Sequence, residues 1–163
     1  MFREMRRKKQ ALSIEECEQI LKRNTAGVLA VDGDDNYPYA VPMSYVYTDF
    51  KIFFHCAKTG HKIDAMMRNE KVSFCVIDED LIVPEEYTTY YRSVIAFGKA
   101  RIMEEEAEKR MAIELIAERY SPDDEAGRMK EIEADFAQVC LVEIAVEHMD
   151  GKEAIELVRN RKT

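Results

Sequence analysis

The chain has 163 residues, 47% of them apolar and 34% charged, which is enough apolar content for one domain with a buried core. Its formal net charge of −8 argues against a general nucleic-acid-binding protein, because such a protein needs a basic surface. No apolar run is long enough to cross a bilayer, and no apolar segment follows the basic N-terminus as a secretion signal requires. We therefore expect a cytoplasmic protein that binds neither nucleic acid nor membranes.

The first part of the chain predicts one helix followed by two strands. Ser13 and Glu16 have the spacing of a capping box, so a helix is expected from Ser13 to about Asn24. Apolar residues over 27–31 and 37–47 predict strands, with a run of turn-forming residues between them. The second strand contains two prolines. Because proline cannot donate to a ladder, part of this strand must lie at an edge, a bulge or a cavity.

The middle of the chain alternates strands with short breaks. A strand over 51–57 is expected to pair as a hairpin with the preceding one, and Gly60 separates it from a short helix over 61–68. Two further strands are expected over 71–78 and 89–103, joined by a polar loop. The sequence has no GxGxxG motif and no βαβ unit of the length that a dinucleotide-binding fold needs.

The last third of the chain predicts two helices and one strand. An amphipathic helix is expected from Glu104 to just before Pro122, and Pro122 can begin a second helix. Residues 138–149 alternate as a final strand, which Asp150 and Gly151 are expected to end as a turn.

Six strands joined mostly by short turns predict a mainly β fold, a six-stranded antiparallel barrel with flanking helices. The sequence contains no internal repeat and no low-complexity segment. We expect a single domain over 1–163, with a basic arm over 1–10 and a charged tail over 154–163.

The four cysteines, Cys17, Cys56, Cys75 and Cys140, include no CxxC pair. Without a secretion signal, reduced thiols are the expected state. Adjacent positions on a strand face opposite sides, so His55 and Cys56 cannot converge on one ion, and we expect no metal site.

The stretch 54–62 has the features of a phosphate site. It runs from a strand through a glycine turn into a helix start, where free backbone N–H groups and a positive partial charge favour an anion. Lys58, His61 and Lys62 add cationic side chains at the same place. The alternative is an ordinary strand-to-helix turn with solvated lysines.

Two other stretches carry weaker signals. A flat ring system needs apolar cover and free backbone groups at its edge, and the strand over 39–45, interrupted by Pro42, offers both. The alternative is a plain edge strand. Arg92 lies in an apolar strand and needs an anionic partner, either a ligand or a carboxylate in a structural ion pair.

Taken together, these stretches resemble the FMN-binding split-barrel family, to which pyridoxamine 5′-phosphate oxidase belongs. The matching segments are YPYAVPMSY over 37–45, HCAKTGHK over 55–62, YRSV over 91–94 and FG over 97–98. The opening FREMRRKKQ over 2–10 is similar to the start of the nitroimidazole-resistance proteins of that family. The resemblance implies a six-stranded split β-barrel that forms a homodimer, with FMN bound at the interface.

The resemblance also implies a role for each group of matching residues. The strand from Val41 to Ser44 would lie along the isoalloxazine edge, the next stretch would flank the ring and ribityl chain, and the glycine turn would hold the phosphate. The cofactor-binding residues implied are Val41, Pro42, Met43, Ser44, His55, Cys56, Ala57, Gly60, His61, Lys62, Arg92, Ser93 and Val94. His55 is the candidate catalytic residue, which would donate a proton or position the substrate. The alternative is a histidine that only hydrogen-bonds FMN.

The function expected from the resemblance is an FMN-dependent oxidoreductase that reduces small heteroaromatic substrates, nitroimidazoles among them. A pyridoxamine phosphate oxidase is a second reading, ranked lower because no second basic cluster near the C-terminus offers a site for the substrate phosphate. A third is a protein that carries flavin or haem without turnover.

Overall fold

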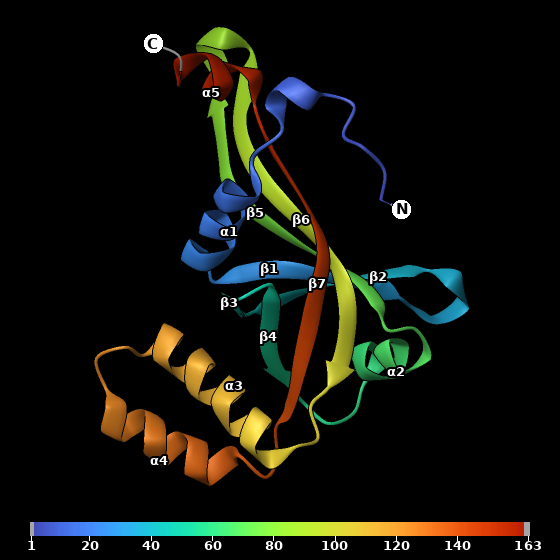
Figure 1. Cartoon of the computed structure of the whole chain (residues 1–163), viewed down its shortest axis with the longest axis vertical. Coiled ribbons are helices and arrows are strands. Elements are labelled where there is room, and N and C mark those ends of the chain that lie inside the picture. Colours follow the sequence, from blue (N-terminus) through green and yellow to red (C-terminus); the bar gives the residue numbers. More distant parts are fainter. Residues whose placement is uncertain (1, 162–163) are drawn as a thin grey trace.

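One antiparallel sheet of seven strands organises the computed structural model, which describes residues 2–161 (Figure 1). The strand order is β2-β1-β5-β6-β7-β4-β3, so β2 and β3 are the edges and the sheet is not closed. The strands are β1 (Ala26–Asp32), β2 (Pro38–Ser44), β3 (Val46–Thr48), β4 (Lys51–Cys56), β5 (Lys71–Val83), β6 (Thr88–Ile102) and β7 (Cys140–Glu153). The expected class, a mainly β antiparallel split barrel with flanking helices, is confirmed. Met1, Lys162 and Thr163, at the ends of the predicted arm and tail, lie outside the described residues.

Tyr45 divides the strand expected over 37–47 into β2 and β3, which gives seven strands where the sequence predicts six. Its side chain is fully buried, and its hydroxyl donates to the carbonyl oxygen of Leu21 at 2.8 Å. Its backbone N–H donates to the carbonyl oxygen of Thr25 at 3.2 Å. The backbone bond extends the β1–β2 register by one position, and the hydroxyl bond holds the side chain against α1 at the point where the chain passes from β2 to β3. The edge position that the prolines of β2 require is confirmed, because β2 pairs with β1 alone among the described strands.

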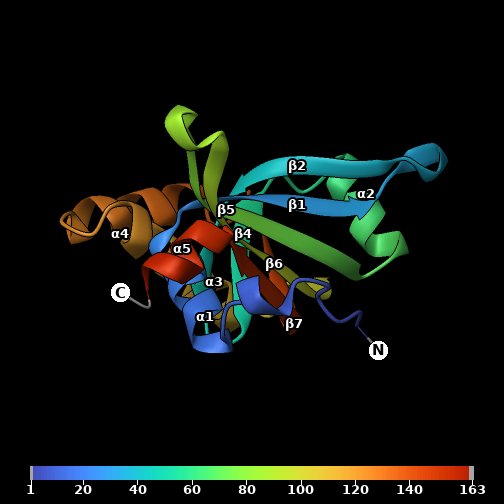
Figure 2. The same cartoon turned by 90° about the horizontal axis from the view of Figure 1, so that it is seen from above.

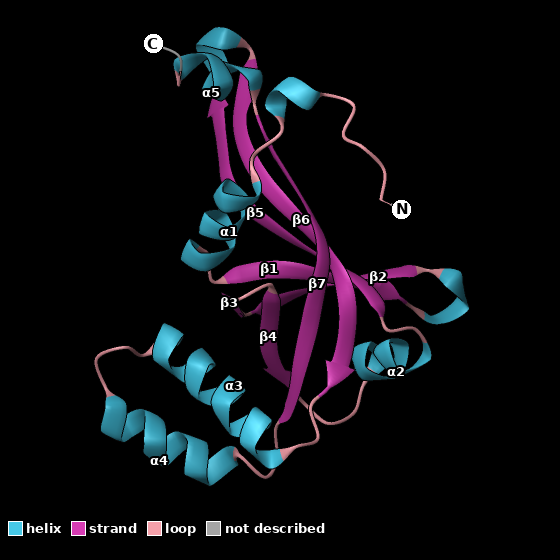
Figure 3. Ribbon diagram, viewed as in Figure 1, coloured by secondary structure: helices cyan, strands magenta, loops and turns pink. Residues whose placement is uncertain are grey.

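Besides three short 3-10 helices, five α-helices accompany the sheet in the described residues (Figure 3). They are α1 (Ile14–Arg23), α2 (His61–Arg68), α3 (Glu106–Tyr120), α4 (Glu125–Asp135) and α5 (Ile155–Asn160). The capping box that begins α1 is confirmed, with Ser13 and Glu16 bonding to each other's backbone N–H groups. Pro122 does not begin α4. The Asp124 carboxylate accepts a hydrogen bond from the Gly127 N–H at 2.8 Å, and this cap starts the helix three residues later than expected.

The C-terminal part differs most from expectation. Asp150 and Gly151 do not form a turn, because β7 continues to Glu153. Gly151 pairs with Val94 on β6, and Leu12 and Cys17 occupy the place where a Cβ would stand. Because Gly151 has no side chain, α1 can pack closely against the sheet at this point. The predicted charged tail begins as helix α5.

Strands β5 and β6 extend past the rest of the sheet as a long hairpin, which projects clearly in Figure 2. Sequence periodicity missed the outer half of β5 because its residues after Asp78 are largely exposed and lose the apolar alternation. The N-terminal arm is anchored near this hairpin. The Gln10 amide donates to the carbonyl oxygen of Glu153 at 2.8 Å and to the Tyr91 hydroxyl at 3.2 Å.

The described residues form two apolar cores, and β4 separates them. Ile52 and Phe54 point into the barrel core, while Phe53 points to the other side and packs with α3 and α4. This alternation decides which way each functional residue on β4 faces. None of the described helices is long and apolar enough to cross a membrane.

Candidate functional site

Strand β2 presents its candidate residues on two opposite faces. Val41 and Met43 pack against the barrel core, whereas Pro42 and Ser44 are exposed on the outer face. The outer two can therefore meet a ligand with their side chains, and the inner two only with backbone groups. Because β2 is an edge strand, one side of its backbone has no strand partner among the described residues.

The same alternation separates His55 from Cys56 on β4. Cys56 packs against the barrel core, while His55 is exposed on the face that carries Phe53 and the α3–α4 pair. The two side chains thus face opposite sides of β4, as the alternation of a strand predicts. Residues 2–161 contain no group of three or more histidine, cysteine or acidic side chains placed to hold an ion.

A cavity of about 740 Å³ lies between β4 and the α3–α4 pair. His55 and Ser44 both line it, so two candidate residues from different strands share one cleft, and charged side chains of the α4 region, among them Asp124, Arg128 and Asp135, line it too. Its apolar lining comes from Ile113, Ile116, Ala117, Ile132, Phe136 and Val139. This volume lies within the range of about 300–1,000 Å³ that is usual for small-molecule sites. We call it the helical cleft.

The glycine turn before α2 has the backbone that its sequence demands. Gly60 has φ of +132°, a conformation that other residues rarely adopt, and it is the N-cap of α2. His61 and Lys62 follow in the first turn of the helix. Lys58 points elsewhere, and its ammonium donates to the carbonyl oxygen of Ala137 at 2.6 Å. The expected contribution of Lys58 at this turn is therefore not seen.

Two residues that the sequence did not single out position His61. The backbone N–H of Asp34 donates to Nε2 of His61 at 3.1 Å, and the Tyr39 ring stacks on the imidazole with centroids 4.2 Å apart. Both come from the β1–β2 hairpin, so the phosphate candidate and the flavin-edge candidate lie side by side. Neither contact follows a helical or strand period, and no signal in one sequence could have predicted it.

Arg92 has carboxylate partners, which is the structural alternative left open by the sequence. It contacts Asp78 at 3.1 Å, Glu79 at 3.2 Å and Glu153 at 3.3 Å. Burial raises the pKa of Asp78, but hydrogen bonds from Arg23, Asn24 and Arg92 outweigh it and hold that pKa below its ordinary value. Arg92 is thus committed to an ion-pair network within this chain.

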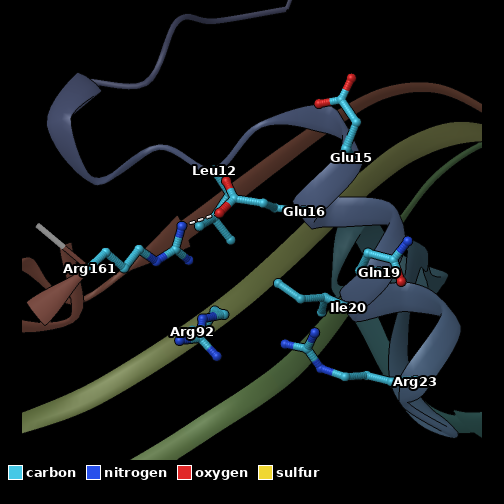
Figure 4. Close-up of a pocket in the computed structure, with 8 residues that line it drawn as sticks. All are labelled: Leu12, Glu15, Glu16, Gln19, Ile20, Arg23, Arg92 and Arg161. Carbon is cyan, nitrogen blue, oxygen red and sulfur yellow. Dashed lines mark hydrogen bonds and ion pairs between the residues drawn. The ribbon is translucent and has the colours of Figure 1, made fainter.

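Figure 4 shows the small cavity of about 310 Å³ beside this network, lined by the three arginines Arg23, Arg92 and Arg161. The guanidinium groups do not make it an anion site. Each is paired with carboxylates, and Glu15 and Glu16 add further negative charge to the lining. The cavity lies between α1, β6 and the end of α5.

Ser93 and Val94 follow the alternation of β6. Val94 is fully buried in the barrel core, and Ser93 faces outward opposite Ile77. Two strands, β1 and β5, lie between β6 and β2 in the sheet. One chain therefore brings Ser44 to His55 and Tyr39 to His61. It does not bring the β6 candidates Arg92, Ser93 and Val94, called the β6 group below, to either of these pairs.

The outer face of the sheet carries an apolar row that crosses four strands in register. Pro42 on β2 pairs with Val28, Val28 with Cys75, and Cys75 with Ile95 on β6. Ile95 remains 38% exposed, and Ile77, two residues along β5, is 63% exposed. We call these residues the outer row. No other element of the described chain covers it completely.

The family model described as pyridoxamine 5′-phosphate oxidase matches residues 13–153 of this chain. The chain belongs to this family. The match includes β1 to β7 and every candidate site residue. No curated protein sequence matches the chain.

Solved structures share the fold. The conserved protein Rv2991 of Mycobacterium tuberculosis superposes with a TM-score of 0.80 at 21% identity, covering 98% of this chain and 94% of that one. A candidate 5-nitroimidazole antibiotic resistance protein of Bacteroides thetaiotaomicron has a TM-score of 0.76 at 23% identity, covering 88% and 86%. An FAD-binding protein of Mesorhizobium loti has a TM-score of 0.62 at 25% identity, covering 89% and 97%.

Proposed function

We propose that this chain is an FMN-dependent oxidoreductase that reduces small heteroaromatic compounds, nitroimidazoles among them, and that it works as a homodimer. The observation that carries the proposal is the position of His55. It is exposed in the helical cleft, which it shares with Ser44 at the end of β2, the edge strand that would border the flavin. Family membership and the resemblance to nitroimidazole-resistance proteins support the reaction class.

The residues present fit a flavin mononucleotide. The unpaired edge of β2 offers backbone donors and acceptors to the rim of a flat ring. The N-terminus of α2, with Gly60, His61 and Lys62, offers backbone N–H groups and a cation to a phosphate. Tyr39 joins the two, because it lies on β2 and stacks on His61. When bound, FMN supplies the electron transfer that these side chains cannot perform.

His55 and the helical cleft would serve the substrate. An imidazole can donate a proton near neutral pH, and His55 is positioned to donate one to a ligand seated in the cleft. Ser44 adds a hydroxyl to the same cleft. The apolar side chains of α3 and α4 would pack against a planar, weakly polar ring, and the charged side chains of the α4 region could meet its polar substituents.

The proposed homodimer accounts for the outer row and for the separated β6 group. A row of apolar side chains across four strands is costly to leave in water, and a second copy would cover it. The partner's β6 would then approach β2 of the first copy across the interface. In that arrangement Ser93 completes the flavin pocket from outside, while Arg92 keeps its ion pairs.

The test of this proposal is a single-turnover experiment. The protein is loaded with FMN, reduced with dithionite without oxygen, and mixed with a 5-nitroimidazole while the flavin absorbance is followed. Reoxidation of the flavin faster than with free reduced FMN supports the reductase. A bound flavin that neither a nicotinamide reduces nor the nitro compound reoxidises would instead indicate a carrier. That outcome is of interest because one structural neighbour is an FAD- and haem-binding protein of Mycobacterium smegmatis.

A further inference from the structure

We propose that Cys56 and Cys140 form a redox-active dithiol, which a peroxide or a small-molecule disulfide converts into an intramolecular disulfide. The two residues are direct partners in the antiparallel β4–β7 ladder. Cys56 is the last residue of β4 and Cys140 is the first of β7, so the pair closes the ladder at its end. All four cysteines of the chain are free thiols in this structure.

The Cα separation at this ladder position is within reach of a disulfide, and a small movement of either strand end would bring the Cβ atoms to the roughly 3.5–4.5 Å that the bond needs. Phe50 and Val146 are opposed one position before Lys51 and Ala145 in the β4–β7 register. The Val146 N–H donates to the carbonyl oxygen of Phe50 at 2.8 Å, so Phe50 and Val146 are a hydrogen-bonded pair. Hydrogen-bonded and open pairs alternate along an antiparallel ladder, so Cys56 and Cys140, six positions further along the same register, are also a hydrogen-bonded pair. Such pairs have Cα atoms about 5.5 Å apart, within the range of about 4.4–6.8 Å that disulfides span. At the end of a ladder, small adjustments of either residue disturb few neighbouring bonds.

The side chains of directly opposed residues point to the same face of a sheet. Here that face is the barrel core, where Cys140 is 6% exposed and Cys56 packs against the core while remaining partly exposed. Burial and the adjacent Cys140 thiol together raise the pKa of the Cys56 thiol to about 11, against an opposing effect of the Lys62 ammonium. The two thiols are therefore neighbours on one face of the ladder, and the partly exposed Cys56 is open to a small reagent.

The other two cysteines have no such partner. Cys17 is fully buried on α1 against Gly151. Cys75 lies on the outer row, with Val28 and Ile95 as its strand partners. Among the four thiols, the β4–β7 pair alone is placed to form a disulfide by ladder register.

The chemistry balances with a peroxide as the oxidant. One thiolate attacks the peroxide, which gives a sulfenic acid and releases water or an alcohol. The second thiol then attacks the sulfenic sulfur, the S–S bond forms, and water leaves. Two thiols have lost two electrons and two protons, and the peroxide has taken them up.

The cross-link would fix a segment that matters for the proposed function. Cys56 stands between His55 and Ala57, directly before the turn that leads to α2. Oxidation would tie this segment to β7 and restrain the end of β4. This consequence rests on the proposed flavin site, whereas formation of the disulfide does not.

The test oxidises the full-length protein with hydrogen peroxide, blocks remaining thiols with iodoacetamide, digests with trypsin and analyses peptides without reductant. We expect peptides 52–58 and 131–152, which carry Cys56 and Cys140, to appear as one linked species that a reductant separates. The disulfide closes a loop of about 80 residues, so the oxidised protein should also unfold at a temperature higher by at least about 5 °C.

Three variants sharpen the result. Cys56→Ser and Cys140→Ser should each abolish the linked species, and Cys75→Ser, the matched control, should keep it. Alkylation of both Cys56 and Cys140 after oxidation of folded wild-type protein would overturn the inference, as would a link between two chains in place of one within a chain. No step needs flavin, so a failure to bind FMN would count against the proposed function and leave this inference intact.

Discussion

The backbone N–H of Asp34 donates a hydrogen bond to Nε2 of His61 at 3.1 Å. Nε2 is thus an acceptor, and the ring proton is on Nδ1. It follows that the 3.6 Å approach of the Asp34 carboxylate to the same nitrogen is not an ion pair. His61 therefore offers an anion one neutral donor, and Lys62 is the cation at the N-terminus of α2.

This relationship predicts how the phosphate of FMN is held. Lys62→Ala should weaken FMN binding by about tenfold or more, the scale of one charge-assisted hydrogen bond, and His61→Ala should weaken it less. Riboflavin, which lacks the phosphate, should bind all three proteins alike. Titration followed by flavin fluorescence measures both ligands. Lys58→Ala is the control, because that ammonium is bonded to Ala137. Equal losses for FMN and riboflavin would contradict the assignment.

His55 is expected to act on the substrate and not on flavin affinity. His55→Ala should retain FMN but slow reoxidation of the reduced flavin by a nitroimidazole by about 10²–10⁴-fold, the usual contribution of a positioned proton donor. Stopped-flow absorbance measures this rate. Thr59→Ala, an exposed change in the following loop, should leave it unchanged. If His55→Ala loses FMN and keeps the rate per bound flavin, the histidine only hydrogen-bonds the cofactor.

The outer row predicts which substitution separates the proposed dimer. Ile95→Glu should place a charge in the middle of the interface and give a monomer in analytical ultracentrifugation, with loss of bound FMN. Ile14→Glu is a matched control, because Ile14 is 43% exposed against 38% for Ile95 and lies in the first turn of α1, where an acidic side chain is tolerated. A wild-type monomer that still binds FMN would contradict the shared site.

Arg92 is expected to stabilise the fold. Its partners Asp78 and Glu153 have side chains only 7% and 3% exposed, so Arg92→Met should lower the free energy of unfolding at pH 7 by about 2–4 kcal/mol. Arg110→Met, which breaks more exposed ion pairs on α3, should lower it by less than about 1 kcal/mol. Urea denaturation measures both. A similar small loss in the two variants would show that the network contributes little.

The same network sets the acid limit of stability. The folded-state pKa of Asp78 lies below its ordinary value of 3.8, so the unfolded chain takes up the proton first as the pH falls. The stabilisation is therefore complete above that value and is lost below it, as the pH passes through the lower folded-state pKa. The difference in unfolding free energy between wild type and Arg92→Met should shrink below pH 3.8. A difference that does not change with pH would exclude this origin.

Capping motifs and proline positions predicted those parts of the fold that depend on residues close together in the sequence. The capping box at Ser13 and the edge position of β2 both follow from a few adjacent residues. The end of β7 could not be predicted in this way. Gly151 looks like a turn residue, but it is retained in the strand because Cys17, distant in the sequence, packs against it.

The candidate site shows the same division. The alternation of β4 predicted that His55 and Cys56 face apart, and the glycine turn placed Lys62 at a helix start. The helical cleft, the Asp34–His61 bond and the carboxylates around Arg92 depend on contacts between distant segments. The sequence left the partner of Arg92 open between a ligand and a carboxylate, and only the arrangement of β5, β6 and β7 decides it.

Binding of FMN is tested most simply by an absorbance spectrum of the purified protein after reconstitution with FMN and removal of free flavin. We expect retained flavin bands corresponding to about one FMN per chain, and the Lys62→Ala variant should lose the flavin more readily. A colourless protein, or one that shows a haem Soret band and no flavin after exposure to both cofactors, would contradict this expectation.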